Sequence, residues 1–158
     1  SRRGTPMLDV GDDAPAFELP DQHGTPTELP TDGTAVVYFY PRADTPGCTT
    51  EACGFRDSWD EFEERGVPVF GISDDPVGDL DAFAEKYDLP FHLLSDPDGE
   101  VARQYDSYGE KDMFGKTFDG TFRNTFVVRD GRIAGVFEGV SPDGHAEEVL
   151  TAIEGTDG

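Results

Sequence analysis

The segment AVVYFYPRADTPGCTTEACGF, residues 35–55, joins an apolar run to the start of a helix. The run has six consecutive apolar residues and ends at Pro41, which is typical of a strand buried at the centre of a sheet. Thr45 and Pro46 then form a helix start, because threonine is a favourable N-cap and proline suits the first helical position. The segment therefore predicts a central strand, a short loop and a helix.

Two further apolar runs have the pattern of the first one and predict two more buried strands. They are VPVFGIS at 67–73 and FHLLS at 91–95. Between them, PVGDLDAFAEKY at 76–87 has apolar residues at helical spacing, and Asp75 before it is the expected N-cap. An order of strand, helix and strand implies right-handed crossovers and a parallel core.

The two ends of the chain predict hairpins and one more helix. Residues 124–139 contain two short strands around an Asp-Gly pair at 130–131, which indicates a type I′ turn. A last helix is expected from about Asp143, and residues 17–29 predict a small hairpin that turns at 23–24. The order predicts an α/β protein with a thioredoxin-like fold: a central mixed β-sheet flanked by helices, with an N-terminal β-hairpin extension.

No repeat, low-complexity tract or linker divides the 158 residues, a length that suits one domain. Residues 1–6, SRRGTP, have no periodicity, and we expect them to remain from an upstream leader sequence. Met7 is then the expected natural start of a single domain over residues 7–158. No apolar run approaches the ~20 residues of a membrane span, and no signal-peptide pattern precedes Met7, so a cytoplasmic location is expected.

The chain is strongly acidic along its whole length. It has 34 Asp plus Glu against 12 Lys plus Arg, a formal net charge of -22. Such a charge repels nucleic acids and anionic membranes, so neither is expected as a partner. The even spread of acidic residues favours a protein of a halophilic archaeon, because at molar salt the Debye length falls to ~3 Å and screens the repulsion.

No cofactor or metal ion is expected. His23, His92 and His145 are dispersed without the spacing of metal ligands. The segment SDPDGE at 95–100 has only a fragment of a calcium-binding loop and is better explained as a turn. Neither a GxGxxG nor a Walker pattern is present, so no nucleotide is implied.

Cys48 is expected in the first turn of its helix, where unpaired backbone N–H groups and the helix dipole stabilise a thiolate. It begins an apolar stripe with spacings of 4, 3, 4 and 3, formed by Cys48, Ala52, Phe55, Trp59 and Phe62. Cys53 lies about 140° around the helix and about 7.5 Å further along its axis. That separation exceeds the Cα limit of about 7 Å for a disulfide, so a bridge between the two cysteines requires this part of the helix to unwind.

The segment FYPRADTPGCTTEACGFRD, residues 39–57, resembles the active site of the peroxiredoxins, most closely the bacterioferritin-comigratory protein or peroxiredoxin Q subfamily. The family motif Pro-x-x-x-Thr/Ser-x-x-Cys matches Pro41, Thr45 and Cys48, and the resolving cysteine of the subfamily matches Cys53. The resemblance covers residues 7–153, with Asn124 as a minor departure. It extends through GDDAPAFELPDQHG, GISDDP, LLSD and FGKTFDGTFRNTFVV.

The resemblance implies a thiol-dependent peroxidase that reduces hydrogen peroxide and organic hydroperoxides. It implies that Cys48 attacks the peroxide and becomes a sulfenic acid, and that Cys53 then forms a disulfide which thioredoxin or a similar dithiol reduces. Arg123 matches the catalytic arginine of the family. The resemblance implies further that Thr45 and the Cys48 N–H hold the peroxide and that Pro41 shields the pocket. The subfamily resemblance also favours a monomer, although dimers occur.

Other interpretations of the same residues are possible. Gly47 allows a small substrate to approach the backbone closely and is a further candidate for substrate binding. Cys53 could lack a resolving role, and Arg123 could be a surface charge. At the level of function, the alternative is a peroxide-responsive redox sensor or binding module without efficient turnover. A general disulfide reductase is less consistent with the sequence, because that chemistry prefers a CxxC pair.

Overall fold

The computed structural model describes residues 8–113 and 115–157, so residues 1–6 and Met7 lie outside the described part. A five-stranded mixed sheet with strand order β5-β4-β3-β8-β9 forms its centre. The strands are β3 (Thr34–Phe39), β4 (Val69–Ser73), β5 (His92–Ser95), β8 (Thr125–Arg129) and β9 (Arg132–Phe137). β3, β4 and β5 run parallel, whereas β8 pairs antiparallel with both β3 and β9. All three apolar runs are thus confirmed as strands, and the first of them is the central one.

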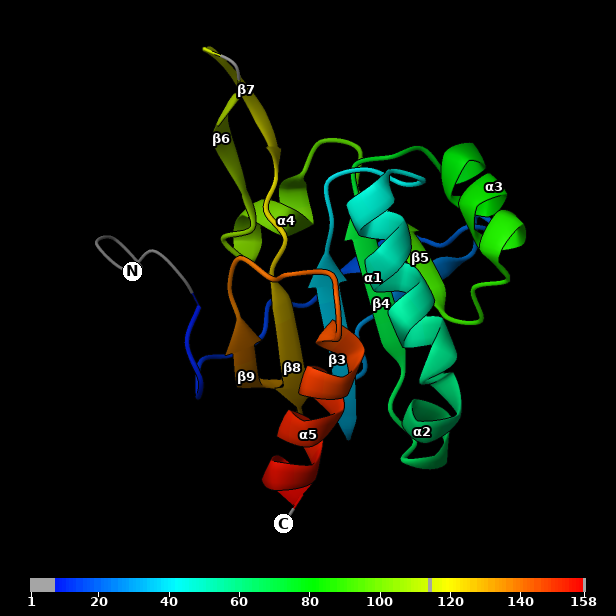
Figure 1. Cartoon of the computed structure of the whole chain (residues 1–158). Coiled ribbons are helices and arrows are strands. Elements are labelled where there is room, and N and C mark those ends of the chain that lie inside the picture. Colours follow the sequence, from blue (N-terminus) through cyan, green and yellow to red (C-terminus); the bar gives the residue numbers. More distant parts are fainter. Residues whose placement is uncertain (1–7, 114, 158) are drawn as a thin grey trace.

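Side chains of β3 alternate between the two faces of the sheet and divide the core into two layers. Val36, Tyr38 and Tyr40 contact the core on the face covered by four of the five helices. Ala35 and Val37 contact the other core, which includes α4 and the N-terminal segment. The helices are α1 (Pro46–Asp57), α2 (Trp59–Glu64), α3 (Val77–Tyr87), α4 (Glu100–Gln104) and α5 (His145–Asp157). Figure 1 shows α1 and α5 side by side in front of the sheet.

The predicted helix after β3 is present, but it is interrupted. α1 ends at Asp57, and Ser58, with φ -101° and ψ 7°, separates it from α2. The predicted apolar stripe nevertheless stays buried across the break, except that Trp59 is partly exposed. Thr45 is the N-cap residue as predicted, but its hydroxyl donates to the Arg42 carbonyl at 2.8 Å and does not cap the helix.

The prediction that Asp75 caps the next helix is wrong. Pro76 occupies the N-cap position of α3, one residue later than expected. The Asp75 carboxylate is buried and accepts hydrogen bonds from the Ala43 N–H at 2.7 Å and the Ser73 hydroxyl at 2.8 Å. Asp75 therefore ties the end of β4 to the loop that precedes α1.

The C-terminal hairpin is confirmed, and a second hairpin was not predicted. Asp130 and Gly131 have φ of 50° and 79°, the two positive values that a type I′ turn requires. The unpredicted hairpin consists of β6 (Tyr108–Met113) and β7 (Lys116–Thr121), which form a separate two-stranded sheet. In Figure 1 it projects from the end of the molecule at which α1 begins. The last helix starts at His145, two residues after the expected position.

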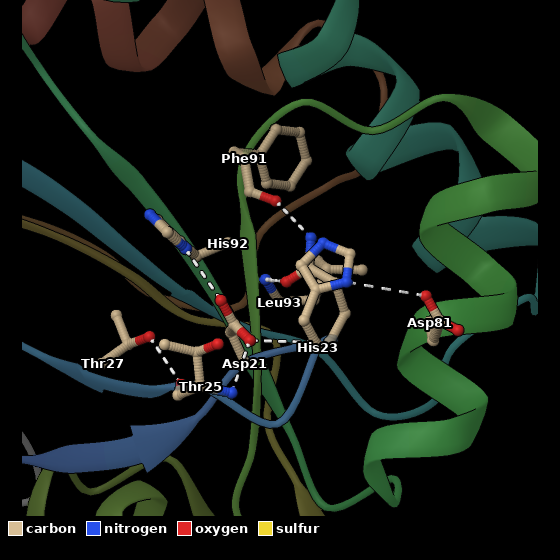
Figure 2. A network of polar contacts seen from close by, with 9 residues as sticks. Asp21, His23, Thr25, Thr27, Asp81, Phe91, His92 and Leu93 are labelled. Carbon is tan, nitrogen blue, oxygen red and sulfur yellow. Dashed lines mark hydrogen bonds and ion pairs between the residues drawn. The ribbon is translucent and has the colours of Figure 1, made fainter.

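The N-terminal hairpin is also confirmed. β1 (Glu18–Pro20) pairs antiparallel with β2 (Pro26–Glu28). The turn between them packs on the start of β5, where the Gln22 side chain donates to the Phe91 carbonyl at 3.0 Å and accepts from the Leu93 N–H at 3.0 Å. Figure 2 shows the ion pairs beside it, between His92 and Asp21 and between His23 and Asp81. A side-chain amide thus occupies the place of a neighbouring strand at the β5 edge.

The opposite edge of the sheet pairs with the residues that precede β1. Gly11 N–H donates to the Ile133 carbonyl, and Ile133 N–H donates to the Asp12 carbonyl, both at 2.8 Å. Ala14 N–H donates to the Gly131 carbonyl at 2.9 Å. The N-terminal segment therefore covers both edge strands of the five-stranded sheet.

Candidate active site

Cys48 lies at the buried start of α1, directly after the central strand. It occupies the third residue of the helix, in the first turn, and is 2% exposed. Its side chain belongs to the core layer formed with Tyr38, Tyr40 and Phe55. The fold thus holds a thiol at the positive end of a helix and against an aromatic surface.

Arg123 contacts the thiol from the connection between β7 and β8. Its Nη2 lies 3.3 Å from Cys48 Sγ, and its Nη1 lies 2.7 Å from Glu51 Oε1. The next residue, Asn124, is buried. It donates from Nδ2 to the Ser107 hydroxyl at 3.0 Å and accepts from the Gly139 N–H at 3.0 Å. Asn124, noted above as a minor departure from the family pattern, therefore holds the backbone that carries the arginine.

Gly47 leaves room for the guanidinium group. A Cβ atom at this position would lie 3.1 Å from Arg123 Nη2 and 3.5 Å from the Pro142 ring. The predicted reason for this glycine was the approach of a substrate. The structure adds a second reason, because any larger residue would press on the group that contacts the thiol.

Glu51 was missed by the sequence analysis. It lies three residues after Cys48 on the same face of α1 and is only 1% exposed. Burial raises the pKa of Glu51 to about 7, although the charge of Arg123 and its hydrogen bond lower it. Oε2 of Glu51 has no hydrogen-bond partner among the described residues. The i, i+3 spacing from Cys48 is the only sequence signal that points to it.

Lys111 on β6 brings a second positive charge toward the site. It is half-buried and donates from Nζ to the Thr121 carbonyl at 2.7 Å. Burial and the charge of Arg123 lower the pKa of Lys111, and the charge of Cys48 opposes this shift. Two basic residues, Arg123 and Lys111, thus lie near the thiol in a chain with a net charge of -22.

The core around the thiol contains the aromatic residues Tyr38, Tyr40 and Phe55, which we call the aromatic floor of the site. Tyr38 stacks on Phe55 with ring centroids 4.8 Å apart, and its hydroxyl has no hydrogen-bond partner among the described residues. Burial is the main cause that raises the pKa of Tyr38 and of Tyr40 well above the usual value, and each keeps its proton at neutral pH. The surroundings of Cys48 therefore have low polarity, which strengthens its interaction with Arg123.

The other two motif residues lie in the loop between β3 and α1. Pro41 and Thr45 are both half-buried there, and the Thr45 hydroxyl is engaged by the Arg42 carbonyl. The structure thus brings Cys48, Gly47 and Arg123 together directly. Pro41 and Thr45 lie in the loop that leads into this group.

Cys53 and Cys48 are free thiols on different faces of an intact α1. Cys53 is half-buried and lines a cleft of about 480 Å³ between α1 and the start of α5 with the loop before it, whereas Cys48 faces the sheet. Pro142 and Asp143 line the cleft on its other side. The separation agrees with the predicted helical geometry, so the two sulfur atoms cannot meet while α1 keeps its shape.

His145 and Asp96 have structural roles. His145 is buried and bonds to the Thr125 hydroxyl at 2.8 Å and to Glu148 at 3.0 Å. Asp96 of the SDPDGE segment accepts the N–H groups of Val101 and Ala102 at the start of α4, so this segment is a turn as predicted. Over residues 8–113 and 115–157 no His, Cys, Asp and Glu cluster could hold a metal ion. Within the same ranges no helix has the length and apolar character needed to span a bilayer.

Comparison with known proteins gives consistent matches over nearly the whole chain. Residues 10–136 match the model of the AhpC/TSA family. The chain is 48% identical over 147 residues to peroxiredoxin Bcp of Escherichia coli, covering 90% of this chain and 94% of that protein. It is 46% identical over 148 residues to a putative peroxiredoxin of Mycobacterium tuberculosis, covering 92% and 94%.

Solved structures give the same result. The bacterioferritin comigratory protein of Xanthomonas campestris, studied for its alkyl peroxide reduction activity, has a TM-score of 0.87 and 35% identity. The match covers 95% of this chain and 100% of that one. Peroxidoxin BcpB of Mycobacterium tuberculosis has a TM-score of 0.83 and 41% identity, with coverage of 94% and 97%.

Proposed function

The chain belongs to the AhpC/TSA family and, within it, to the Bcp/PrxQ peroxiredoxins, and from this premise we propose how its residues divide the work of a thiol-dependent peroxidase. The predicted thioredoxin-like fold is confirmed by the same matches, and so is the predicted enzyme class. One observation carries the assignment of roles: Arg123 Nη2 lies 3.3 Å from the sulfur of Cys48.

Cys48 is the peroxidatic nucleophile in this proposal. Its thiolate attacks the terminal peroxide oxygen, so that an S–O bond forms while the O–O bond breaks. The sulfur becomes a sulfenic acid, and the leaving oxygen takes a proton and departs as water or an alcohol. Arg123 stabilises the thiolate first and then the charge that develops on the peroxide oxygens.

The flanking residues prepare the pocket. Thr45 turns its hydroxyl from the Arg42 carbonyl to the bound peroxide, and the Cys48 N–H helps to hold it. Gly47 keeps the space that the peroxide and the guanidinium share, and Pro41 limits the access of water. The contact of Arg123 with the sulfur is already formed, whereas the role of Thr45 needs a side-chain rotation.

Cys53 is the resolving residue in this proposal. Its thiol attacks the sulfenic acid, which forms the Cys48–Cys53 disulfide and releases water. The reaction requires the first part of α1 to unwind, because the two thiols lie on different faces of it. A thioredoxin-like dithiol then reduces the disulfide by exchange, and α1 re-forms.

The substrates we propose are hydrogen peroxide and organic hydroperoxides. The alkyl peroxide reduction activity of the Xanthomonas campestris relative supports the second class. The apolar floor of Tyr38 and Phe55 beneath Cys48 and the local positive charge suit a small, weakly acidic O–O group.

The function is tested by turnover in excess peroxide. With thioredoxin, thioredoxin reductase and NADPH, the protein should consume many equivalents of hydrogen peroxide or cumene hydroperoxide, measured as NADPH oxidation at 340 nm. A redox sensor without efficient turnover would stop after about one equivalent per chain. Omission of thioredoxin is the control, and it should limit the reaction to that single equivalent. Turnover that stops at one equivalent in the complete system would favour the sensor.

We also propose a monomeric protein of the cytoplasm of a halophilic archaeon. The support is its formal net charge of -22, with acidic residues in nearly every segment. Both edges of the central sheet are covered by the N-terminal segment of the same chain, which supports the monomer.

Removal of salt should destabilise the protein. Between molar and near-zero KCl the melting temperature should fall by roughly 10 °C or more, because a few kcal/mol of carboxylate repulsion is no longer screened. Circular dichroism at 222 nm measures this change. Sucrose added at near-zero salt is the control for solute exclusion and should restore little of the loss. An equal melting temperature at both salt concentrations would contradict the halophilic origin.

A further inference from the structure

Glu51 is a buried acid that the proposed roles leave unused. It lies one turn after Cys48, and its side chain is 0% exposed. Oε1 is 2.7 Å from Arg123 Nη1, while Oε2 has no partner among the described residues. A buried carboxylate lowers the stability of the fold unless a cation offsets its charge or a proton neutralises it.

Arg123 contacts both acids of this site. Arg123 uses Nη2 for Cys48 Sγ and Nη1 for Glu51 Oε1, so a single positive charge serves both groups. Burial raises the pKa of Tyr38 on β3 and of Tyr40, the residue after that strand, so both stay neutral, and both are close enough for the charge of Glu51 to raise their pKa further. Lys111, the second cation near the thiol, donates instead to the Thr121 carbonyl at 2.7 Å. The charges in contact with Arg123 therefore balance when only one of the two acids is ionised.

The oxidation of Cys48 changes this balance. Before the reaction the thiolate is the partner of Arg123, and an ionised Glu51 would be an excess negative charge. After the reaction the sulfenic acid is neutral, and Arg123 can stabilise a carboxylate instead. Burial raises the pKa of Glu51 to about 7 when the sulfur carries no charge, and a thiolate on Cys48 raises it further. Loss of the thiolate charge therefore lets Glu51 ionise near and above neutral pH.

We propose that Glu51 holds a proton while Cys48 is a thiolate and releases it when Cys48 becomes a sulfenic acid. The inference rests on the proposed function, and it makes Glu51 a positioning residue that acts through Arg123. The reaction forms the S–O bond, breaks the O–O bond and leaves an alkoxide or hydroxide, which takes up one proton. Glu51 gives up one proton in the same step, so the site needs no net proton from bulk water and keeps its total charge.

Proton uptake in a single oxidation tests this inference. The Cys53→Ser variant stops at the sulfenic acid, and its proton uptake after one equivalent of hydrogen peroxide is measured by stopped flow with a pH indicator in weak buffer. The thiolate fraction before mixing is measured by absorbance at 240 nm. The pKa of about 7 applies to Glu51 beside an uncharged sulfur, so uptake should fall short of that fraction by about 0.1 proton per chain at pH 6, about 0.5 at pH 7 and about 0.9 at pH 8.

The double variant Cys53→Ser, Glu51→Gln should take up one proton per thiolate at every pH. Glu61→Gln in the same background is the matched control, because Glu61 is exposed on α2, and it should behave like Cys53→Ser alone. A purely structural role of Glu51 would change the reaction rate and leave the proton count equal in all three proteins. Should Glu51→Gln fail to fold, the pH dependence of proton uptake in Cys53→Ser alone still tests whether Glu51 releases a proton.

Two failures can be told apart in this experiment. Absence of a sulfenic acid, seen as no mass gain of one oxygen and no dimedone adduct, would overturn the proposed function. A sulfenic acid formed with one proton taken up per thiolate from pH 6 to pH 8 would overturn the role of Glu51 alone.

Discussion

Replacement of Cys48 by serine is expected to abolish peroxide reduction, lowering turnover by roughly 10⁴-fold or more. A serine hydroxyl in the same place is not ionised near neutral pH and cannot cycle through a sulfenic acid. The serine should fit the buried site with little change in stability, because the side chain keeps nearly the same shape. NADPH-coupled turnover with thioredoxin measures the loss, and thermal unfolding verifies that the variant is folded.

Cys53→Ser is the matched control for this prediction. It removes the other thiol of α1 but leaves the Cys48–Arg123 contact untouched. One equivalent of peroxide should still be consumed at the rate of the wild type, after which cycling with thioredoxin should stop. If Cys48→Ser turned over peroxide normally, or if Cys53→Ser cycled normally, the division of roles between the two cysteines would be wrong.

Loss of the Arg123 charge is expected to have the second largest effect. Arg123→Met should lower the rate constant of Cys48 oxidation by about 10²–10³-fold, the size found when one preorganised donor to a developing charge is removed. Stopped-flow fluorescence of the single tryptophan, Trp59, measures this rate. Arg123→Lys is the conservative control. It should recover only part of the rate, because an ammonium group cannot contact the sulfur and Glu51 together.

The same variant should lose stability in a pH-dependent way. Without Arg123, nothing on the guanidinium side lowers the pKa of Glu51, so it rises further above the value in the unfolded chain. Stability that depends on a protonated Glu51 is complete below about pH 4.5 and is lost as pH rises through the folded pKa. The free energy of unfolding of Arg123→Met should therefore drop more at pH 8 than at pH 5. Addition of Glu51→Gln should remove this pH dependence without restoring the oxidation rate.

Local sequence patterns predicted the parts of the fold that local forces determine. The apolar run at 35–40, the Asp-Gly turn at 130–131 and the start of α1 at Pro46 each depend on residues that are neighbours in the chain. The β6–β7 hairpin was missed because YGEKDMFGKTFDGT has no alternation of apolar and polar residues. It stands away from the sheet, so its strands do not need one apolar face.

In the candidate site, too, the residues that could be predicted from the sequence are those that lie close together in the chain. The motif residues from Pro41 to Cys53 lie in one segment and could be identified together. Glu51 could not, because its partner Arg123 is 72 residues further along the chain. Among 34 acidic residues, the i, i+3 spacing from Cys48 is too weak a signal to single out this glutamate. Asp75 was misassigned for a related reason, since its partner Ala43 lies 32 residues earlier.

The cover of both sheet edges by the N-terminal segment has a consequence for the newly made chain. An unpaired edge strand is a template for association with other chains. Here the residues that pair with β9 and the Gln22 turn that pairs with β5 are synthesised before either of those strands leaves the ribosome. Each edge strand therefore finds its partner already translated, and the nascent sheet can close without leaving an edge open to neighbouring chains.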